Sequence, residues 1–173
     1  NTKTKAKIIS IASGKGGVGK TSVALKFALT LAKRGYKTLL IDCDYNLSNS
    51  YIKLNISNER NLYSFYSGEK SLDECIIKND NFSLLAGCNG NLDLYKNKLG
   101  GELFIINVLG LLENKYDYIF LDSPAGIDKD ILALNAYSDD RIIVVTPDKS
   151  SMTDSYSLIK ILNKNYGVNR NFL

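Results

Sequence analysis

Residues 8–22 read Ile-Ile-Ser-Ile-Ala-Ser-Gly-Lys-Gly-Gly-Val-Gly-Lys-Thr-Ser and contain three structural signals in succession. The run at residues 8–12 is rich in β-branched side chains and predicts a buried strand. A glycine-rich turn follows, and a helix is expected to begin at Lys20 and to end near Gly35. A second strand is predicted at residues 37–41, so this segment forms a β–α–β unit with parallel strands and a right-handed crossover.

The glycine-rich turn fits a pattern that binds phosphate, because residues 14–21 match G-x-x-x-x-G-K-[ST]. Glycines leave backbone N–H groups free to surround a phosphate chain, and the helix N-terminus adds partial positive charge. We expect Lys20 to bind the β- and γ-phosphates and the Thr21 hydroxyl to ligate Mg²⁺. The alternative, an ordinary turn, is disfavoured because the flanking strand and helix are both visible. The predicted nucleotide-binding residues of this stretch are Gly14, Lys15, Gly16, Gly17, Val18, Gly19, Lys20, Thr21 and Ser22.

The bulk composition is that of a soluble globular domain. The sequence has 173 residues, of which 45% are hydrophobic and 23% charged, and its net charge is +4. This length suits one domain, and the mildly basic balance agrees with a polyphosphate ligand without requiring nucleic acid. No run of about 18 apolar residues predicts a transmembrane helix, and no apolar segment predicts a secretory signal. We therefore expect a cytoplasmic protein.

Histidine is absent, and the three cysteines, Cys43, Cys75 and Cys88, lack C-x-x-C spacing. This composition argues against a zinc site and against any histidine-based catalytic triad. We expect free, mostly buried thiols.

Acidic residues follow two of the predicted strands. Asp42 and Asp44 come at the carboxyl end of the second strand, which is the edge that faces ligands in an open α/β sheet. Residues 118–121 predict another buried strand, which ends at Asp122. Near a magnesium nucleotide, one carboxylate of the first pair could hold a metal-bound water while the other orients the attacking water, and Asp122 would hold Mg²⁺ through water. The alternative for the first pair is two surface acids in a loop. Gly126, shortly after Asp122, would place a backbone N–H near the γ-phosphate.

The remaining elements follow from hydrophobic periodicity. Two short helices are predicted within residues 59–78, strands at 82–86 and 141–146, and a helix at 99–115. A final helix is expected to be capped by Ser150 or Ser151. Two apolar stripes should pack against the sheet: Leu103, Ile106, Leu109 and Leu112 on one helix, and Met152, Tyr156, Ile159 and Leu162 on the last.

Residues 114–117 spell N-K-x-D, the motif with which GTPases read guanine. The motif precedes a strand and would therefore lie at the amino edge of the sheet, away from the phosphates. A guanine-reading role is disfavoured.

Several of these motifs together resemble the MinD/ParA ATPases. The phosphate loop carries a second lysine, Lys15, as in the deviant Walker A loop of that family. Residues 42–49 resemble its switch I, and residues 122–127 resemble its switch II. Residues 61–75, 84–87 and 146–160 resemble the flagellar-number regulators of the FlhG (FleN or YlxH) type. The sequence departs from the family pattern at Asn46, where glycine is common, and at Ser50–Tyr51.

The resemblance implies a doubly wound α/β fold with a mostly parallel sheet, of the P-loop NTPase (SIMIBI) type. It implies Mg²⁺-dependent hydrolysis of ATP to ADP and phosphate, slow and stimulated by a partner, with Lys15, Lys20 and Asp44 in catalysis and Thr21, Asp42 and Asp122 at the metal. Lys15 would reach the phosphates of a second protomer in an ATP-dependent homodimer.

The biological role implied is control of flagellar number or placement. The partner would be a flagellar GTPase, a C-ring protein or another regulatory protein, and no specific nucleic acid. Alternatives are a MinD-type division-site ATPase and a nucleotide-binding scaffold with little turnover. A ParA-type segregation protein is disfavoured because residues 45–47 lack a Gln-Gly pair, and an iron–sulfur reductase because no cysteine follows the strand at 118–122.

The resemblance also concerns the extent of the chain. In the family, a further strand, the adenine-contacting residues and a membrane-targeting helix follow the part that corresponds to residues 1–173. We therefore expect one P-loop ATPase domain without the family's C-terminal part, and peripheral association with the inner face of the cell membrane through that later segment.

Overall fold

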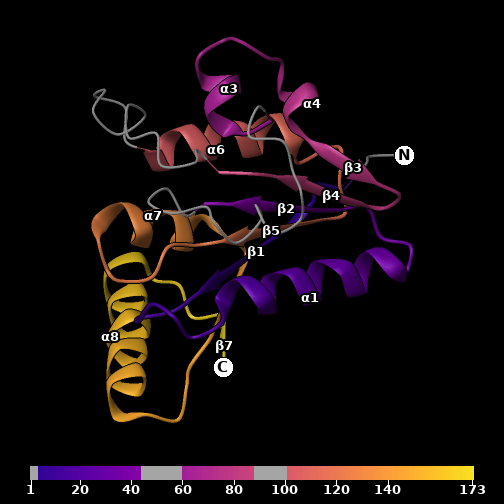
Figure 1. Ribbon diagram of the computed structural model, residues 1–173. Coiled ribbons are helices and arrows are strands. Elements are labelled where there is room, and N and C mark those ends of the chain that lie inside the picture. Colours follow the sequence, from indigo (N-terminus) through magenta and orange to yellow (C-terminus); the bar gives the residue numbers. More distant parts are fainter. Residues whose placement is uncertain (1–3, 44–59, 88–100) are drawn as a thin grey trace.

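The computed structural model describes residues 4–43, 60–87 and 101–173. Within this part of the chain, the strands form one sheet in the order β3-β4-β2-β5-β1-β6-β7 (Figure 1). All neighbouring strands are parallel except β3, which pairs antiparallel with β4. The predicted doubly wound, mostly parallel α/β fold is confirmed. The strands are β1 (Lys7–Ala12), β2 (Thr38–Asp42), β3 (Ile77–Asn79), β4 (Phe82–Leu85), β5 (Tyr118–Asp122), β6 (Asp140–Ile143) and β7 (Asn171–Phe172).

Helices cover both faces of the sheet. Helix α1 lies on one face, and α3, α4 and α6 lie on the other (Figure 1). Helix α7 packs beside α6, and α8 packs against α7 at the end of the sheet that carries β6. The helices are α1 (Lys20–Lys33), α3 (Leu62–Tyr66), α4 (Leu72–Cys75), α6 (Gly101–Leu112), α7 (Lys129–Tyr137) and α8 (Lys149–Tyr166).

The central strands explain why the sheet is doubly covered. Every residue of β2 is buried, as expected for a parallel strand with helices on both faces. Along β1 the side chains alternate, so that Ile8 packs toward α6 while Ile11 packs toward α1. Ala24 and Ala28 of α1 are fully buried, and their small side chains allow this helix to approach the sheet closely, as predicted.

Register places two acidic residues side by side. Strands β2 and β5 pair in parallel with Asp42 opposite Asp122, each at the carboxyl end of its strand. Strand β1 lies on the other side of β5, and Ile11 pairs with Asp122. The loop that follows β1 therefore begins next to the two carboxylates.

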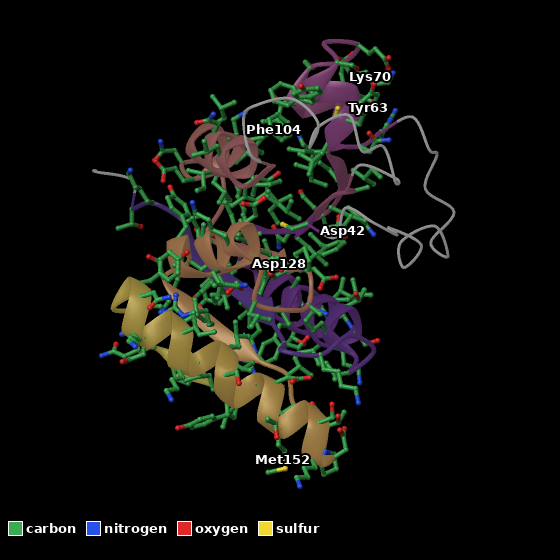
Figure 2. The ribbon with its side chains drawn as sticks, turned by 90° about the vertical axis from the view of Figure 1, so that its left-hand side faces the viewer. Asp42, Tyr63, Lys70, Phe104, Asp128 and Met152 are labelled. Carbon is green, nitrogen blue, oxygen red and sulfur yellow. The ribbon has the colours of Figure 1, made fainter. Side chains whose placement is uncertain are left out.

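The apolar stripe predicted for the last helix is wrong in part. Met152 and Tyr156 are 58% and 67% exposed, and Met152 points away from the body of the molecule (Figure 2). Leu162 is buried as predicted, but the packed face also contains Ser151 and Ser155. Small side chains lie there because α8 packs directly against the phosphate loop: a Cβ on Gly14 would overlap the backbone of residues 154 and 155.

The cap of α8 also differs from the prediction. The helix is capped by Asp148, whose side chain accepts a hydrogen bond from the Ser151 N–H at 2.9 Å. The Ser151 hydroxyl instead accepts from the Thr146 N–H. Aspartate is as good an N-cap as serine, so the sequence pattern alone did not decide between them.

Helix α6 is likewise rotated from the predicted stripe. Leu109 and Leu112 are buried as expected, but Leu103 is 48% exposed, and Ile105 and Val108 fill the core instead. Helix α7 and the short strands β3 and β7 were not predicted. Cys43 and Cys75 are buried and form no disulfide, as expected, and Cys88 lies outside the described residues.

A buried arginine joins the elements around β6. The Arg141 guanidinium donates to the Asn171 side chain at 2.7 Å and to the carbonyl oxygens of Asn135 and Ser138 at 3.0 and 2.7 Å. Burial lowers the pKa of Arg141 from its ordinary value. Arg141 thus connects β6 with β7 and with the end of α7. Among the helices described, none combines the length and apolarity needed to cross a bilayer.

Candidate nucleotide site

The loop between β1 and α1 has the backbone that a phosphate cradle requires. Gly17 and Gly19 adopt positive φ angles of 75° and 95°, which side chains disfavour. Gly19 is also the N-cap residue of α1, so the amides of the first helical turn lie directly after the loop. This arrangement presents backbone donors at the positive end of a helix, next to the carboxyl edge of the sheet.

Gly14 is required for a different reason. Its backbone lies against that of Asp154 in α8, leaving no space for a side chain. Gly16, by contrast, has open space around it. The loop is therefore held from one side by α8 and open on the other, where Lys15 and Gly17 are exposed.

The predicted metal-site residues lie together. The Thr21 hydroxyl donates to Asp122 Oδ2 at 2.7 Å, across 101 residues of sequence. Asp122 and Asp42 are 3% and 2% exposed, and the Cys43 N–H donates to the Asp122 carbonyl at 3.0 Å. One hydroxyl and two adjacent carboxylates form the hard oxygen set that suits Mg²⁺, which takes one or two protein carboxylates and completes its shell with phosphate and water.

Gly126 lies against the phosphate loop. Its N–H donates to the Ser13 carbonyl at 3.0 Å with φ at +116°, and the Ser13 hydroxyl donates to the Lys15 carbonyl at 2.7 Å. The segment after β5 is thereby attached to the loop through a backbone hydrogen bond.

Lys15 is held by a residue that the sequence reasoning did not select. Its ammonium lies 3.4 Å from Asp148 Oδ1, at the N-terminus of α8. The Asp148 carboxylate also accepts from the Thr146 hydroxyl and the Ser151 N–H. These hydrogen bonds, first that of Thr146, and then the charge of Lys15 lower the pKa of Asp148 to about 2. Its capping role could have been found from the sequence, because aspartate directly before a predicted helix is a preferred N-cap residue.

Of the other predicted catalytic residues, the structure describes Lys20 but not Asp44. Lys20, the first residue of α1, is half-buried beside the loop. Asp44 lies outside the described residues, as do Asn46 and the Ser50–Tyr51 departure. Ser22 and Val18 lie in the same stretch, exposed and partly exposed respectively. The described residues thus bring together Lys15, Lys20, Thr21, Asp42, Asp122 and Gly126 at one edge of the sheet.

The N-K-x-D stretch lies at the opposite edge. Asp117 comes directly before β5, and its Oδ2 accepts from the Lys37 N–H at 2.8 Å. The carboxylate that would have to read a guanine base is therefore occupied by backbone, far along the strand from the phosphate loop. This placement agrees with the prediction from sequence.

Comparison with known proteins gives the family. Residues 6–172 match the family model described as an AAA domain. The chain is 36% identical over 168 residues to the flagellum site-determining protein YlxH of Helicobacter pylori, covering 95% of this chain and 56% of the relative. It is 37% identical over 164 residues to the septum site-determining protein MinD of Neisseria meningitidis, covering 91% and 59%. The chain thus spans less than two thirds of the length of these curated relatives.

Comparison with solved structures leads to the same family. MinD of Pyrococcus horikoshii complexed with Mg-ADP superposes with a TM-score of 0.79 at 29% identity, covering 93% of this chain and 66% of that one. A plasmid partition protein of Borrelia burgdorferi bound to AMPPNP gives 0.77 at 31% identity, covering 98% and 73%. Both proteins share the overall fold of this chain. The chain therefore belongs to the MinD/ParA-type family of P-loop ATPases, together with proteins of the YlxH and FleN kind.

Proposed function

We propose that this chain binds and slowly hydrolyses Mg-ATP and uses the nucleotide as a dimerisation switch in the control of flagellar number or placement. The observation that supports this most is the Thr21–Asp122 hydrogen bond beside Asp42, directly after a phosphate loop with two left-handed glycines. Similarity to YlxH and to the antiactivator FleN of Pseudomonas aeruginosa supports the flagellar role.

The residues have separable tasks in this proposal. The loop amides and Lys20 bind the phosphate chain, and Thr21, Asp42 and Asp122 hold the metal, which supplies charge neutralisation of the β- and γ-phosphates. Asp44 orients the attacking water. Gly126 exchanges its bond to Ser13 for one to phosphate, so the segment after β5 responds to the nucleotide.

Lys15 provides the switch. Its ion pair with Asp148 is 43% and 46% exposed, and such pairs contribute only about 0–1 kcal/mol. Breaking this ion pair therefore costs little free energy, and Lys15 can leave Asp148 to bind the phosphates of a second protomer. The bound state would gain a charge-assisted contact across the dimer, so the ATP form dimerises and the ADP form does not.

A division-site role is the second candidate, because the chain is as similar to MinD of Neisseria meningitidis as to YlxH. Both roles use the same chemistry and differ only in the partner protein.

Phosphate release from Mg-ATP tests the enzymatic part. We expect slow turnover by the protein that Asp44→Ala abolishes, with nucleotide affinity retained. An exposed acid between α3 and α4, Glu69, gives the matched control Glu69→Ala. Tight ATP binding without turnover in the parent protein would favour a nucleotide-binding scaffold instead.

A further inference from the structure

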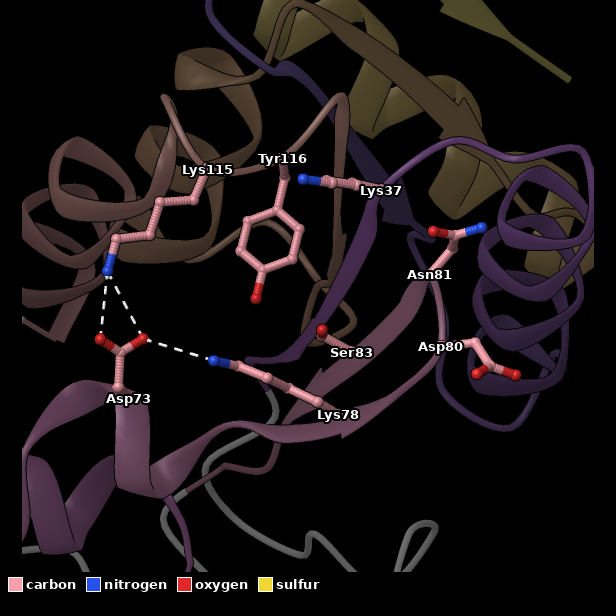
Figure 3. Close-up of a pocket in the computed structure, with 8 residues that line it drawn as sticks. All are labelled: Lys37, Asp73, Lys78, Asp80, Asn81, Ser83, Lys115 and Tyr116. Carbon is pink, nitrogen blue, oxygen red and sulfur yellow. Dashed lines mark hydrogen bonds and ion pairs between the residues drawn. The ribbon is translucent and has the colours of Figure 1, made fainter.

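A second polar hollow lies at the amino edge of the sheet, away from the phosphate loop. It has a volume of about 230 Å³ and lies where β2, β4 and β5 begin, with β3 and α4 along one side (Figure 3). Three lysines line it, Lys37, Lys78 and Lys115, together with Ser83 and Tyr116. Neither the nucleotide chemistry nor the core packing uses these side chains as a group.

The hollow has more hydrogen-bond donors than acceptors. Lys78 and Lys115 both pair with the Asp73 carboxylate, at 3.7 and 3.3 Å, so two ammonium groups share one acid. Figure 3 shows Asp73 between these lysines, while Asp80 lies on the far side toward α1. The lining as a whole has three lysines against two aspartates, Asp73 and Asp80, and so carries one surplus positive charge.

Three further donors have no acceptor in the structure. Within residues 4–43, 60–87 and 101–173, the Lys37 ammonium and the hydroxyls of Ser83 and Tyr116 make no hydrogen bond or ion pair. Ser83 is 95% buried, yet it lines the hollow from the middle of β4. The Ser83 hydroxyl is therefore reached only from the hollow, where a ligand oxygen can accept its hydrogen.

We propose that this hollow binds a small phosphate monoester. A phosphate group carries the negative charge that the surplus of lysines favours, and its oxygens are enough acceptors for the lysines and for both hydroxyls. The Tyr116 ring forms a flat wall for the short body of the ester (Figure 3). The hollow is smaller than the pockets of about 300–1,000 Å³ that hold drug-sized ligands, which excludes a whole nucleotide.

The test is a titration of the ¹⁵N-labelled protein with phenyl phosphate, followed by amide chemical shifts. We expect saturable shifts at Lys37, Ser83 and Tyr116. The double variant Lys37→Gln/Ser83→Ala should weaken this binding at least tenfold. Lys160→Gln, an exposed lysine of α8, is the matched control and should leave it unchanged. The spectra of the variants also report whether each one is folded.

The phosphate loop is a competing site and is separated in the same spectra. Phenyl phosphate bound at the phosphate loop would shift the amide signals of Gly17 and Gly19. The variant Lys20→Ala should remove these shifts and leave those at Ser83 unchanged. Shifts confined to the loop, or an affinity unchanged in Lys37→Gln/Ser83→Ala, would overturn the proposal. Equal binding of inorganic phosphate would assign the hollow to the free ion, and equal binding of glutarate would overturn the preference for phosphate.

Discussion

At the carboxyl edge of the sheet, Asp42 and Asp122 are almost fully buried, whereas at the amino edge the side chains of Lys78 and Lys115 are 59% and 51% exposed. The buried carboxylates are held in fixed positions by strand register and by the Thr21 hydroxyl. The exposed lysines are held by long, weak ion pairs to Asp73. One edge thus presents fixed carboxylates, as the proposed magnesium nucleotide requires, and the other presents exposed lysines, as the proposed anion requires.

The largest expected effect of a single change is at Gly14. Gly14→Val forces a side chain into the backbone of α8 and should lower the free energy of unfolding by about 3 kcal/mol. Urea denaturation measures this. Gly16→Val is the matched control, because open space surrounds Gly16, and it should cost far less. Equal losses for the two variants would contradict the close packing of the loop on α8.

Removing the Thr21 hydroxyl should have an intermediate effect. Thr21→Val deletes a 2.7 Å hydrogen bond to a carboxylate and one oxygen of the magnesium set, so the affinity for Mg-ATP should fall about tenfold, or about 1.4 kcal/mol. Calorimetric titration with and without Mg²⁺ measures it. Thr30→Val, on the same helix with its hydroxyl bonded to Lys26, should bind normally. A loss that is equal without Mg²⁺ would place Thr21 outside the metal site.

The stability of the protein at acid pH should depend on the ionisation of the Asp148 carboxyl group. Its pKa is about 2 in the folded protein and 3.8 ordinarily, so its ionised form contributes stability above pH 3.8 that is lost as pH falls toward 2. Asp148→Asn keeps a good helix cap but lacks the charge. The stability difference between parent and variant should therefore shrink from pH 5 to pH 2 in urea denaturation. A difference independent of pH in this window would refute the assignment.

The smallest expected effect is at the amino edge. Lys115→Gln removes an exposed ion pair with Asp73 and should change the free energy of unfolding by about 0.5 kcal/mol or less. Arg141→Gln, which removes a buried guanidinium that donates to five residues, provides the contrast and should cost several times more. A large loss in Lys115→Gln would show that this edge is as rigid as the other.

The residues at the carboxyl edge of the sheet could be predicted from the sequence, because short contiguous segments supply them. Residues 14–21 are contiguous, and each acid directly follows the strand that positions it, so the contact of Thr21 with Asp122 follows from parallel register. The predictions of the two apolar stripes were wrong in part, because the buried face of a helix depends on residues that are distant in the sequence. Which face of α8 is buried depends on Gly14, about 140 residues earlier in the chain, which selects Ser151 and Ser155 over Met152 and Tyr156.

The hollow at the amino edge could not be predicted from the sequence, because its residues lie far apart in the chain. Its residues come from the starts of several strands and from α4, and no short motif links Lys37 with Ser83 or Asp73. Asp148 was predictable only in part. Its capping pattern is local, but its contact with Lys15 joins residues that are 133 positions apart. Local chemistry is thus predictable where one segment supplies it, and long-range packing is not.

The central claim is that Lys15 exchanges a partner within its own chain for the phosphates of a second protomer. Light scattering after size exclusion, with Mg-ADP and with Mg-ATP, measures it directly, using Asp44→Ala to retain the ATP state. The account predicts a dimer with ATP alone, lost in Lys15→Ala and kept in Lys160→Ala. A monomer under every condition, with ATP demonstrably bound, would contradict it.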